Sequence, residues 1–281
     1  MELHHIDPEH EIGQLRGFLS RSDPHDYLLA DIEDWVSEGR LWAGVEEGNW
    51  VAFGRIHDLG RGEGWVSGLR VDRVRRGQGL GRQFLTALLS DARSIGLTEV
   101  RAVIEDGNLA SRRLFARLGF GAIFEMSLRT AKAGIGSAEP LRPARSGEGP
   151  DGPVGWLPSR TGRVDLLPGA EGGRLGRWDP RLLQRWTREG KLYVGPGIAV
   201  AVQVDWLREP PTMWVNPLRG EPGSLLPAIS MLAKSLGQDG WQGYLPSTEE
   251  LRRQYANLGL VPHPHWGDRI HLYERIETQP A

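Results

Sequence analysis

Two short sequence patterns occur twice in this chain, in the same order, and they constrain its fold more than any other feature. Residues 35–42 (Trp-Val-Ser-Glu-Gly-Arg-Leu-Trp) are similar to residues 186–193 (Trp-Thr-Arg-Glu-Gly-Lys-Leu-Tyr). Residues 112–120 are similar in the same way to residues 252–260. Similar segments in a conserved order indicate a duplicated structural unit. The length of 281 residues also suits two domains of ordinary size.

The stretch between the two copies has the composition of a linker. Residues 131–155 contain six Gly and four Pro and few large apolar side chains. Such a composition is typical of a linker or of a long irregular crossing. We therefore predict a first domain over residues 1–130, a linker over 131–155 and a second domain over 156–281.

The first copy is predicted to alternate helices and strands. Asp23-Pro24 has the form of a helix start, and apolar residues at helical spacing run from Leu28 to Val36, before a stop at Gly39. The elements expected after it are strands over 41–47, 50–57 and 64–71, a helix from Leu80 to Gly96, a strand over 100–104, a helix over 108–118 and a strand over 120–128. Such alternation predicts a mixed sheet flanked by helices.

The second copy repeats parts of this design. Asp179-Pro180 opens a helical pattern that ends at Gly190. Ser247-Thr248-Glu249-Glu250 is typical of a capping box, and it should open the last helix. We therefore predict an α/β (α+β) fold of two similar tandem domains, each with a mixed, mostly antiparallel sheet flanked by helices.

Composition narrows the class of protein. Lys and Arg number 34 and Asp and Glu 36, so the formal net charge is −2, and neither nucleic acid nor a membrane surface is expected as a partner. The chain has no cysteine, which excludes disulfides, thiolate metal ligands and a cysteine nucleophile. We see no signal-peptide pattern and no run of ~20 apolar residues, so we expect a cytoplasmic protein.

The most informative local feature is a basic, glycine-rich turn between a strand and a helix. The strand that ends at Val71 is followed by several arginines and by three alternate glycines. Glycine lets a backbone approach a ligand closely, and N–H groups at a helix start attract anions. The residues expected to hold a pyrophosphate are Arg76, Gly77, Gln78, Gly79, Leu80, Gly81 and Arg82. The alternative is a glycine-rich turn with a solvated basic rim.

Two other phosphate-binding patterns fit this turn less well. The Rossmann pattern G-x-G-x-x-G would need a glycine where the chain has Arg82. The Walker pattern, which ends in Gly-Lys-Ser or Gly-Lys-Thr, is absent from the sequence.

The turn and a second motif resemble the GNAT acetyltransferase superfamily. The cofactor loop of that family, Arg/Gln-x-x-Gly-x-Gly/Ala, is similar to residues 76–81. Its later motif, Asn-x-x-Ala-x-x-Leu-Tyr-x-x-x-Gly-Phe, is similar to the set Asn108, Ser111, Leu114, Phe115, Gly119 and Phe120. The resemblance covers residues 1–130 and extends more weakly to the second copy, so the whole chain resembles a tandem GNAT protein.

The resemblance implies an N-acyltransferase that moves an acetyl group from acetyl-CoA to a primary amine on a small molecule or peptide, without a metal. It also implies that CoA lies between the strand ending at Val71 and the strand over 100–104. The main chains of Leu69 and Val71 would bind the pantetheine, and Asn108 would either bond the cofactor or cap its helix. A non-catalytic acyl-CoA-binding or interaction protein is the alternative.

Catalytic side chains are less evident than the cofactor loop. The family's tyrosine, which can protonate the leaving thiolate, is replaced by Phe115 in the cofactor motif, and Tyr27 is the only tyrosine of the first copy. Glu105 and His57, each near the end of a predicted strand, are candidate general bases, with ordinary surface roles as the alternative. His263 and His265 could form a metal pair, but a polar loop is the favoured interpretation.

The second copy has lost the chemistry of the loop. Around Gly223, which we align with Gly79, Pro222 removes a backbone donor and Glu221 brings a negative charge. We therefore expect one working cofactor site, in the first copy. The second copy would shape the substrate cleft or mediate assembly, and a second site for another ligand is the alternative.

Overall fold

A computed structural model describes residues 1–30, 32–37, 40–150, 166–168, 174–177, 179–205, 212–264 and 266–276. The chain divides into two compact units, which we call unit 1 and unit 2. Unit 1 consists of Met1–Val103, Asn108–Gly121 and the segment that begins at Tyr273, and unit 2 of Ile104–Gly107 and Ala122–Leu272. No helix of the described residues is long and apolar enough to cross a bilayer.

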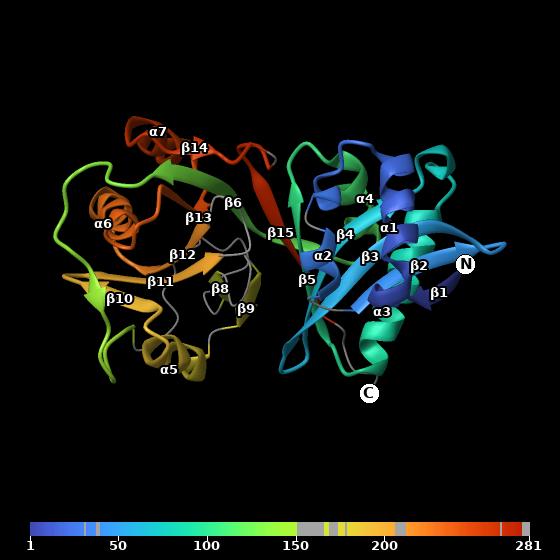
Figure 1. The fold of residues 1–281 in the computed structure, drawn as a ribbon, viewed down its shortest axis with the longest axis horizontal. Helices are drawn as coiled ribbons and strands as arrows, with labels where there is room; N and C mark the ends of the chain where they lie inside the picture. The colour runs from blue at the N-terminus through green and yellow to red at the C-terminus, as the bar shows by residue number, and fades with distance from the viewer. Residues whose placement is uncertain are drawn as a thin grey trace. The chain divides into compact units, whose positions relative to one another are not determined.

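Unit 1 is a mixed sheet covered by helices (Figure 1). Its strands are β1 (Glu2–His5), β2 (Arg40–Glu46), β3 (Asn49–Gly60), β4 (Glu63–Val71), β5 (Glu99–Glu105) and the end of β15 (Ile270–Ile276), in that spatial order. Its helices are α1 (Pro8–Ser22), α2 (Ile32–Ser37), α3 (Leu80–Ser94) and α4 (Leu109–Arg117), with short 3₁₀ helices η1 (Tyr27–Leu29) and η2 (Arg73–Arg75). Strands β4 and β5 run parallel, and β1 to β4 are antiparallel.

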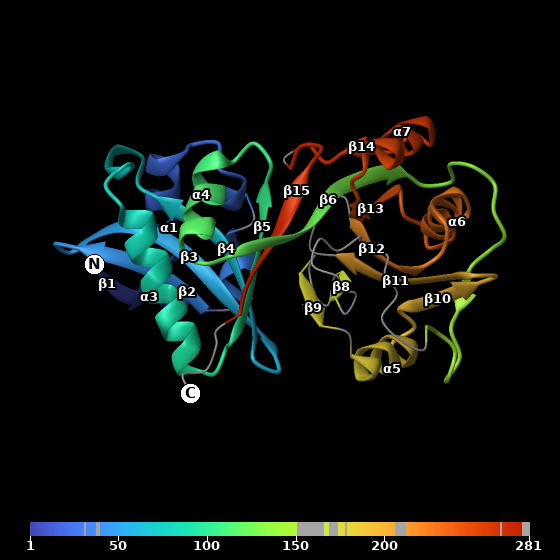
Figure 2. The same cartoon turned by 180° about the vertical axis from the view of Figure 1, so that it is seen from behind.

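Alternation along β2 and β3 sends side chains to opposite faces of this sheet. Ala43 and Phe53 pack into a core that α1, η1 and α2 cover. Phe84 of α3 packs on the other face, against Gly44 and Gly54. A Cβ added to either glycine would overlap with the Phe84 ring. Figure 1 shows α1 and α2 in front of the strands. Figure 2, the view from the opposite side, shows α3 and α4 in front of them.

The first helix, α1, was not predicted, and it precedes the segment that was predicted as a helix. Asp7 is the cap of α1, with its Oδ1 accepting from the N–H of Glu9 at 2.9 Å. Asp23, the predicted cap, instead follows the end of α1, and its Oδ1 accepts from His25 N at 3.0 Å. Both Asp-Pro pairs fit a helix start, but η1 and α2 divide the segment after Asp23. Gly39, the predicted stop, lies outside the described residues.

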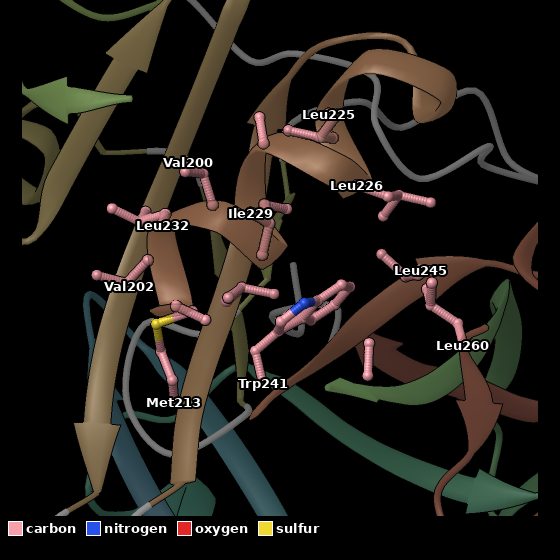
Figure 3. Packing of buried hydrophobic residues seen from close by; sticks show 14 of the residues in the cluster. Val200, Val202, Met213, Leu225, Leu226, Ile229, Leu232, Trp241, Leu245 and Leu260 are labelled. Carbon is pink, nitrogen blue, oxygen red and sulfur yellow. The ribbon is translucent and has the colours of Figure 1, made fainter. Parts of the chain in front are cut away.

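Unit 2 has the same kind of architecture. Its elements are β6 (Gly121–Lys132, mostly in this unit), β7 (Arg142–Pro143), β8 (Leu166–Pro168), β9 (Leu175–Arg177), α5 (Pro180–Arg188), β10 (Leu192–Gly195), β11 (Ile198–Asp205), β12 (Thr212–Arg219), α6 (Pro222–Ser235), β13 (Gly240–Pro246), α7 (Glu249–Asn257) and β14 (Val261–Pro262). The spatial order is β6-β13-β12-β11-β10-β7. In its core, Leu226 and Ile229 of α6 pack with Trp241 (Figure 3).

The order of elements confirms the predicted duplication. The series α2-β2-β3-β4-α3-β5-α4 of unit 1 recurs in unit 2 as α5-β10-β11-β12-α6-β13-α7. In both series the third and fourth strands are parallel. Asp179 caps α5 as predicted. In α7 the cap is Thr248, whose Oγ1 accepts from Leu251 N at 3.2 Å. The helix therefore starts one residue later than a capping box beginning at Ser247 would place it.

The last strand of each copy is exchanged between the units. β6 follows α4 in sequence, but it pairs antiparallel with β13 of unit 2 from Met126 to Lys132. β15 follows α7, but its residues from Tyr273 cluster with unit 1, next to β5 in the strand order. The compact units therefore differ from the predicted blocks 1–130 and 156–281, because the strand after each last helix completes the other unit.

The predicted linker contains regular structure. Its first residues end β6, and Arg142–Pro143 form β7, which pairs with β10 of unit 2. Residues 151–155 lie outside the described residues.

Candidate cofactor site

Strands β4 and β5 pair over only part of their length. Their parallel register covers Glu63↔Glu99, Gly64↔Val100 and Trp65↔Arg101. For the described residues 66–71 no pair with β5 is found, although β4 stays paired with β3 as far as Val71. The main chain of β4 after Trp65 is therefore available to a ligand on its β5 side.

A bulge bends β4 at the start of this unpaired stretch. The register with β3 shifts between Phe53↔Arg70 and Arg55↔Ser67, and Gly68 has a φ of +65°. A Cβ on Gly68 would overlap with the ring of Trp35 of α2, so only glycine fits beneath that ring. The Arg55 guanidinium lies 3.5 Å from the centroid of the Trp35 ring and makes a cation–π contact with it. These contacts fix the bulge that precedes Leu69.

The loop after β4 turns twice on glycine. Asp72 caps η2, with its Oδ1 accepting from Val74 N at 3.1 Å. Gly77 and Gly79 both have a φ of +81°, and an added Cβ on either would meet nothing within 4 Å. Left-handed glycines next to a helix start form a concave row of N–H groups. Open space beside both α-carbons leaves room for a ligand.

The N–H groups at the glycine-rich end of this loop and at the start of α3 are unpaired within the described part of the chain. Within α3 the first donors to find one are Arg82 N and Gln83 N, which both bond to Gly79 O. For the N–H groups of residues 77–81, no partner is found among the described residues. Gly79, the cap residue of α3, has no side chain that could satisfy them. A helix start with free donors and a favourable dipole is suited to an anion.

The arginines of the loop have different tasks. Arg75 is bound to the Glu46 carboxylate at 2.8 Å and to Gln78 Oε1 at 3.0 Å, so it holds the shape of the loop. Arg76 donates from Nε to Val71 O at 3.3 Å. Arg82 is exposed and has no partner among the described residues, so its charge is available to a phosphate.

The start of α3 lies against α4. An added Cβ on Gly81 would lie 3.4 Å from Val71 and 3.5 Å from Leu114 of α4. Leu80 is buried and anchors the first turn. Asn108 caps α4, with its Oδ1 accepting from Ser111 N at 3.1 Å. The capping role of Asn108 is thus observed, and for its side-chain NH₂ no partner is found among the described residues.

A family comparison agrees with this geometry. Residues 10–120 match the model of the acetyltransferase (GNAT) family. The first copy belongs to the GNAT family. No curated protein matches the chain in sequence.

Several solved structures have a similar fold over nearly the whole length of this chain. A protein from Thermoplasma acidophilum assigned as an acetyltransferase has 19% identity and a TM-score of 0.63, covering 98% of this chain and 100% of its own. A GCN5-related N-acetyltransferase from Sphaerobacter thermophilus has 14% identity and a TM-score of 0.59, covering 98% and 95%. A tandem GNAT protein from the clavulanic acid biosynthesis pathway has 14% identity and a TM-score of 0.57, covering 100% and 99%. The fold is therefore that of tandem GNAT proteins.

The residue at the tyrosine position of the GNAT motif is buried. Phe115 is 3% exposed, and its ring makes an edge contact with Phe120 at 4.8 Å between centroids. Its ring also lies 6.5 Å from that of Tyr273, which comes from β15. Tyr273 was not predicted as part of the first GNAT domain, because it is far from that domain in sequence.

The two candidate bases lie at different levels of the sheet. His57 is buried, and it pairs across the sheet with Trp65 of β4. Trp65 lies four residues, or roughly 13 Å, before Leu69 along that strand. Glu105 is half-buried at the end of β5. Glu105 lies four residues after Arg101, the last residue of β5 that pairs with β4. Of the two candidates, Glu105 is the one that lies in the part of β5 that does not pair with β4.

The corresponding connection in unit 2, between β12 and α6, is much shorter than the loop of unit 1. β12 ends at Arg219 and α6 begins at Pro222, so only Gly220 and Glu221 remain where unit 1 has residues 72–79. Glu221, and not Gly223, takes the cap position of Gly79, which corrects the predicted alignment by two residues. Gly223 has no positive φ. A short loop with a carboxylate at the helix start is unsuited to an anion.

The described residues contain no group of three or more His, Asp or Glu side chains that could hold a metal. His263 lies in the turn after β14, and its N–H donates to Leu128 O at 2.9 Å. His265, the second residue of the predicted pair, lies outside the described residues.

Proposed function

We propose that the chain transfers an acetyl group from acetyl-CoA to a primary amine, at a single site in unit 1. The observation that carries the proposal is the row of unsatisfied N–H groups at residues 77–81, placed where β4 leaves β5 in a GNAT domain. GNAT membership and fold support acyl transfer in general. Acetyl as the acyl group and an amine as the acceptor are our inference.

Each part of the site has a proposed role in holding acetyl-CoA. The N–H groups of residues 77–81 would bind the pyrophosphate, with the charges of Arg76 and Arg82 beside them. The main chains of Leu69 and Val71 would bind the pantetheine along the unpaired edge of β4. The N–H of Leu69 would stabilise negative charge that develops on the thioester oxygen.

The proton of the acceptor needs a base on this chain. Acetyl-CoA supplies an activated thioester carbonyl, and only a neutral amine can attack it. Glu105, half-buried at the end of β5, is the proposed base, and it would take the proton directly or through one water. His57 is the second candidate. Phe115 carries no proton, so the leaving thiolate would be protonated by water or by the ammonium product.

Turnover of an amine panel tests this function. With acetyl-CoA and a set of small-molecule and peptide amines, release of free thiol should depend on both enzyme and amine. CoA binding without turnover of any amine would instead support the second candidate, a non-catalytic acyl-CoA-binding protein. Phe115, at the position of the family's proton donor, is the observation that favours that candidate.

Phe115→Tyr restores the hydroxyl of the GNAT motif. Because the ring already packs between Phe120 and Tyr273, we expect the variant to fold like the parent. If protonation of the thiolate limits the rate, kcat should rise by up to the roughly 10²–10⁴-fold typical of general acid help. Steady-state kinetics with an amine found in the panel measures it. An unchanged kcat with intact CoA binding would show that protonation at this position does not control the rate.

A further inference from the structure

Strand β15 and the residue before it contact β5, α4 and the loop that joins these two elements. The strand follows the last helix of the second copy, yet its residues from Tyr273 belong to unit 1. There β15 lies beside β5 in the strand order. Because its side chains alternate between the two faces of the sheet, neighbouring residues of β15 reach different partners.

Tyr273 contacts α4. Its hydroxyl accepts from Arg112 Nε at 3.2 Å, and its ring lies 6.5 Å from the ring of Phe115. Tyr273 is 5% exposed, so its hydroxyl depends on partners within the protein. Arg112 and Phe115 are one turn apart on α4, and the contact with Tyr273 therefore fixes both the position and the rotation of that helix.

Glu274, the next residue, contacts β5. Its carboxylate accepts from Arg101 Nε at 2.9 Å. Arg101 is fully buried and also donates to Glu63 of β4 and to Glu99 of β5. This ion cluster joins β15 to the stretch where β4 and β5 are still paired.

The start of β15 contacts the loop that leads from β5 into α4. Asp106 N donates to Arg269 O at 2.9 Å, and the Asp106 carboxylate accepts from Arg269 Nη2 at 2.9 Å. The other Asp106 oxygen lies 2.7 Å from Nε2 of His271, which is buried. Asp106 precedes Asn108, the cap of α4, by two residues. The segment 269–274 thus contacts β5, the following loop and α4.

We propose that Tyr273 is a positioning residue of the cofactor site, acting through Arg112 to hold α4 against the start of α3. The inference rests on the proposed function. Leu114 of α4 approaches Gly81 of the N–H row, so a shift of α4 would alter the space in which the pyrophosphate is proposed to bind. The second GNAT copy, which has lost its own loop, would then serve the first copy by supplying this strand.

Tyr273→Phe tests the inference, because it keeps the packed ring and removes only the hydroxyl. Calorimetric titration of the full chain with CoA, well below the melting temperature, should show a Kd about tenfold above that of the parent. Arg112→Gln should weaken CoA to a similar extent. The double variant should lose less affinity than the sum of the two single losses, since both changes remove the hydrogen bond between Arg112 and Tyr273.

Tyr255→Phe is the matched control. Tyr255 lies on α7, at the position that corresponds to Phe115, and like Tyr273 it is a buried tyrosine with a hydrogen-bonded hydroxyl, which donates to Pro246 O at 3.0 Å. Burial raises the pKa of the Tyr255 hydroxyl. The control should lose stability on the same scale but keep the CoA affinity of the parent.

The outcomes separate this inference from the function on which it rests. A parent chain that does not bind CoA would overturn both. A parent that binds CoA, together with a Tyr273→Phe variant that binds within twofold, would overturn the positioning role alone. Independent, additive losses in Arg112→Gln and Tyr273→Phe would also contradict it, because they would show that the two side chains do not act through each other.

Discussion

Gly79→Val should weaken CoA binding by about two to four orders of magnitude. Gly79 has a φ of +81° and faces open space beside the row of free N–H groups. A branched side chain there would enter the space proposed for the pyrophosphate and shift the donors on either side. Loss of two charge-assisted hydrogen bonds, each about 1.5–3 kcal/mol, gives an effect of this size. Calorimetric titration with CoA measures the affinity.

The control for this variant lies at the other end of the same helix. Gly96 follows α3 with a φ of +84°, and an added Cβ there also meets nothing within 4 Å. Gly96→Val should therefore suffer the same backbone strain and a similar loss of melting temperature, but it should keep its CoA affinity. Gly223→Val in unit 2 should also bind CoA within a few-fold of the parent. Equal loss in Gly79→Val and Gly96→Val would mean that strain, and not the site, explains the effect.

Arg101→Met should lower the free energy of unfolding by about 3–5 kcal/mol. Arg101 is fully buried and is the common partner of Glu63, Glu99 and Glu274. Methionine would fill much of the same volume but leave three carboxylates without this cation, and breaking a buried ion cluster by removing one partner is costly. For units of this size, thermal unfolding should shift downward by roughly 10 °C.

Arg117→Met serves as the reference for this stability prediction. Arg117 is exposed at the end of α4, and its loss should change the melting temperature by no more than 1–2 °C, as is usual for surface positions. Differential scanning calorimetry of both variants gives the comparison. A melting temperature of Arg101→Met equal to that of the parent would show that the cluster does not stabilise unit 1.

The parts of the fold that depend on local sequence were predictable. The glycine turn before α3, the cap at Asn108 and the cap at Asp179 each depend on a few adjacent residues, and the structure places helix starts at all three. The partial pairing of β4 with β5 agrees with the gap that the GNAT resemblance implied.

Long-range features were not predictable from the same patterns. A strand carries the same alternation whether it pairs with its own copy or with the other, so nothing in β6 or β15 indicates their exchange. Tyr273 was missed as a neighbour of Phe115 for this reason. The helix start at Asp7-Pro8 was not predicted, whereas Asp23-Pro24, the same residue pair, follows the end of α1, so the pair alone does not identify a helix start.

The alignment of Gly223 with Gly79 failed for a different reason. It compared residue types along the chain, whereas the loop of unit 2 had been shortened to Gly220 and Glu221. A deletion of this kind shifts every later residue, and it becomes visible only when the helix caps Gly79 and Glu221 are compared in space.

The number of CoA molecules bound per chain tests the central claim most directly. Calorimetric titration of the full, unmodified chain with CoA should give one site, because unit 1 has the row of free N–H groups and unit 2 has a shortened loop with a carboxylate at its helix start. A stoichiometry of two would contradict the assignment of a single site to unit 1. Absence of binding would contradict the proposed CoA-dependent function altogether.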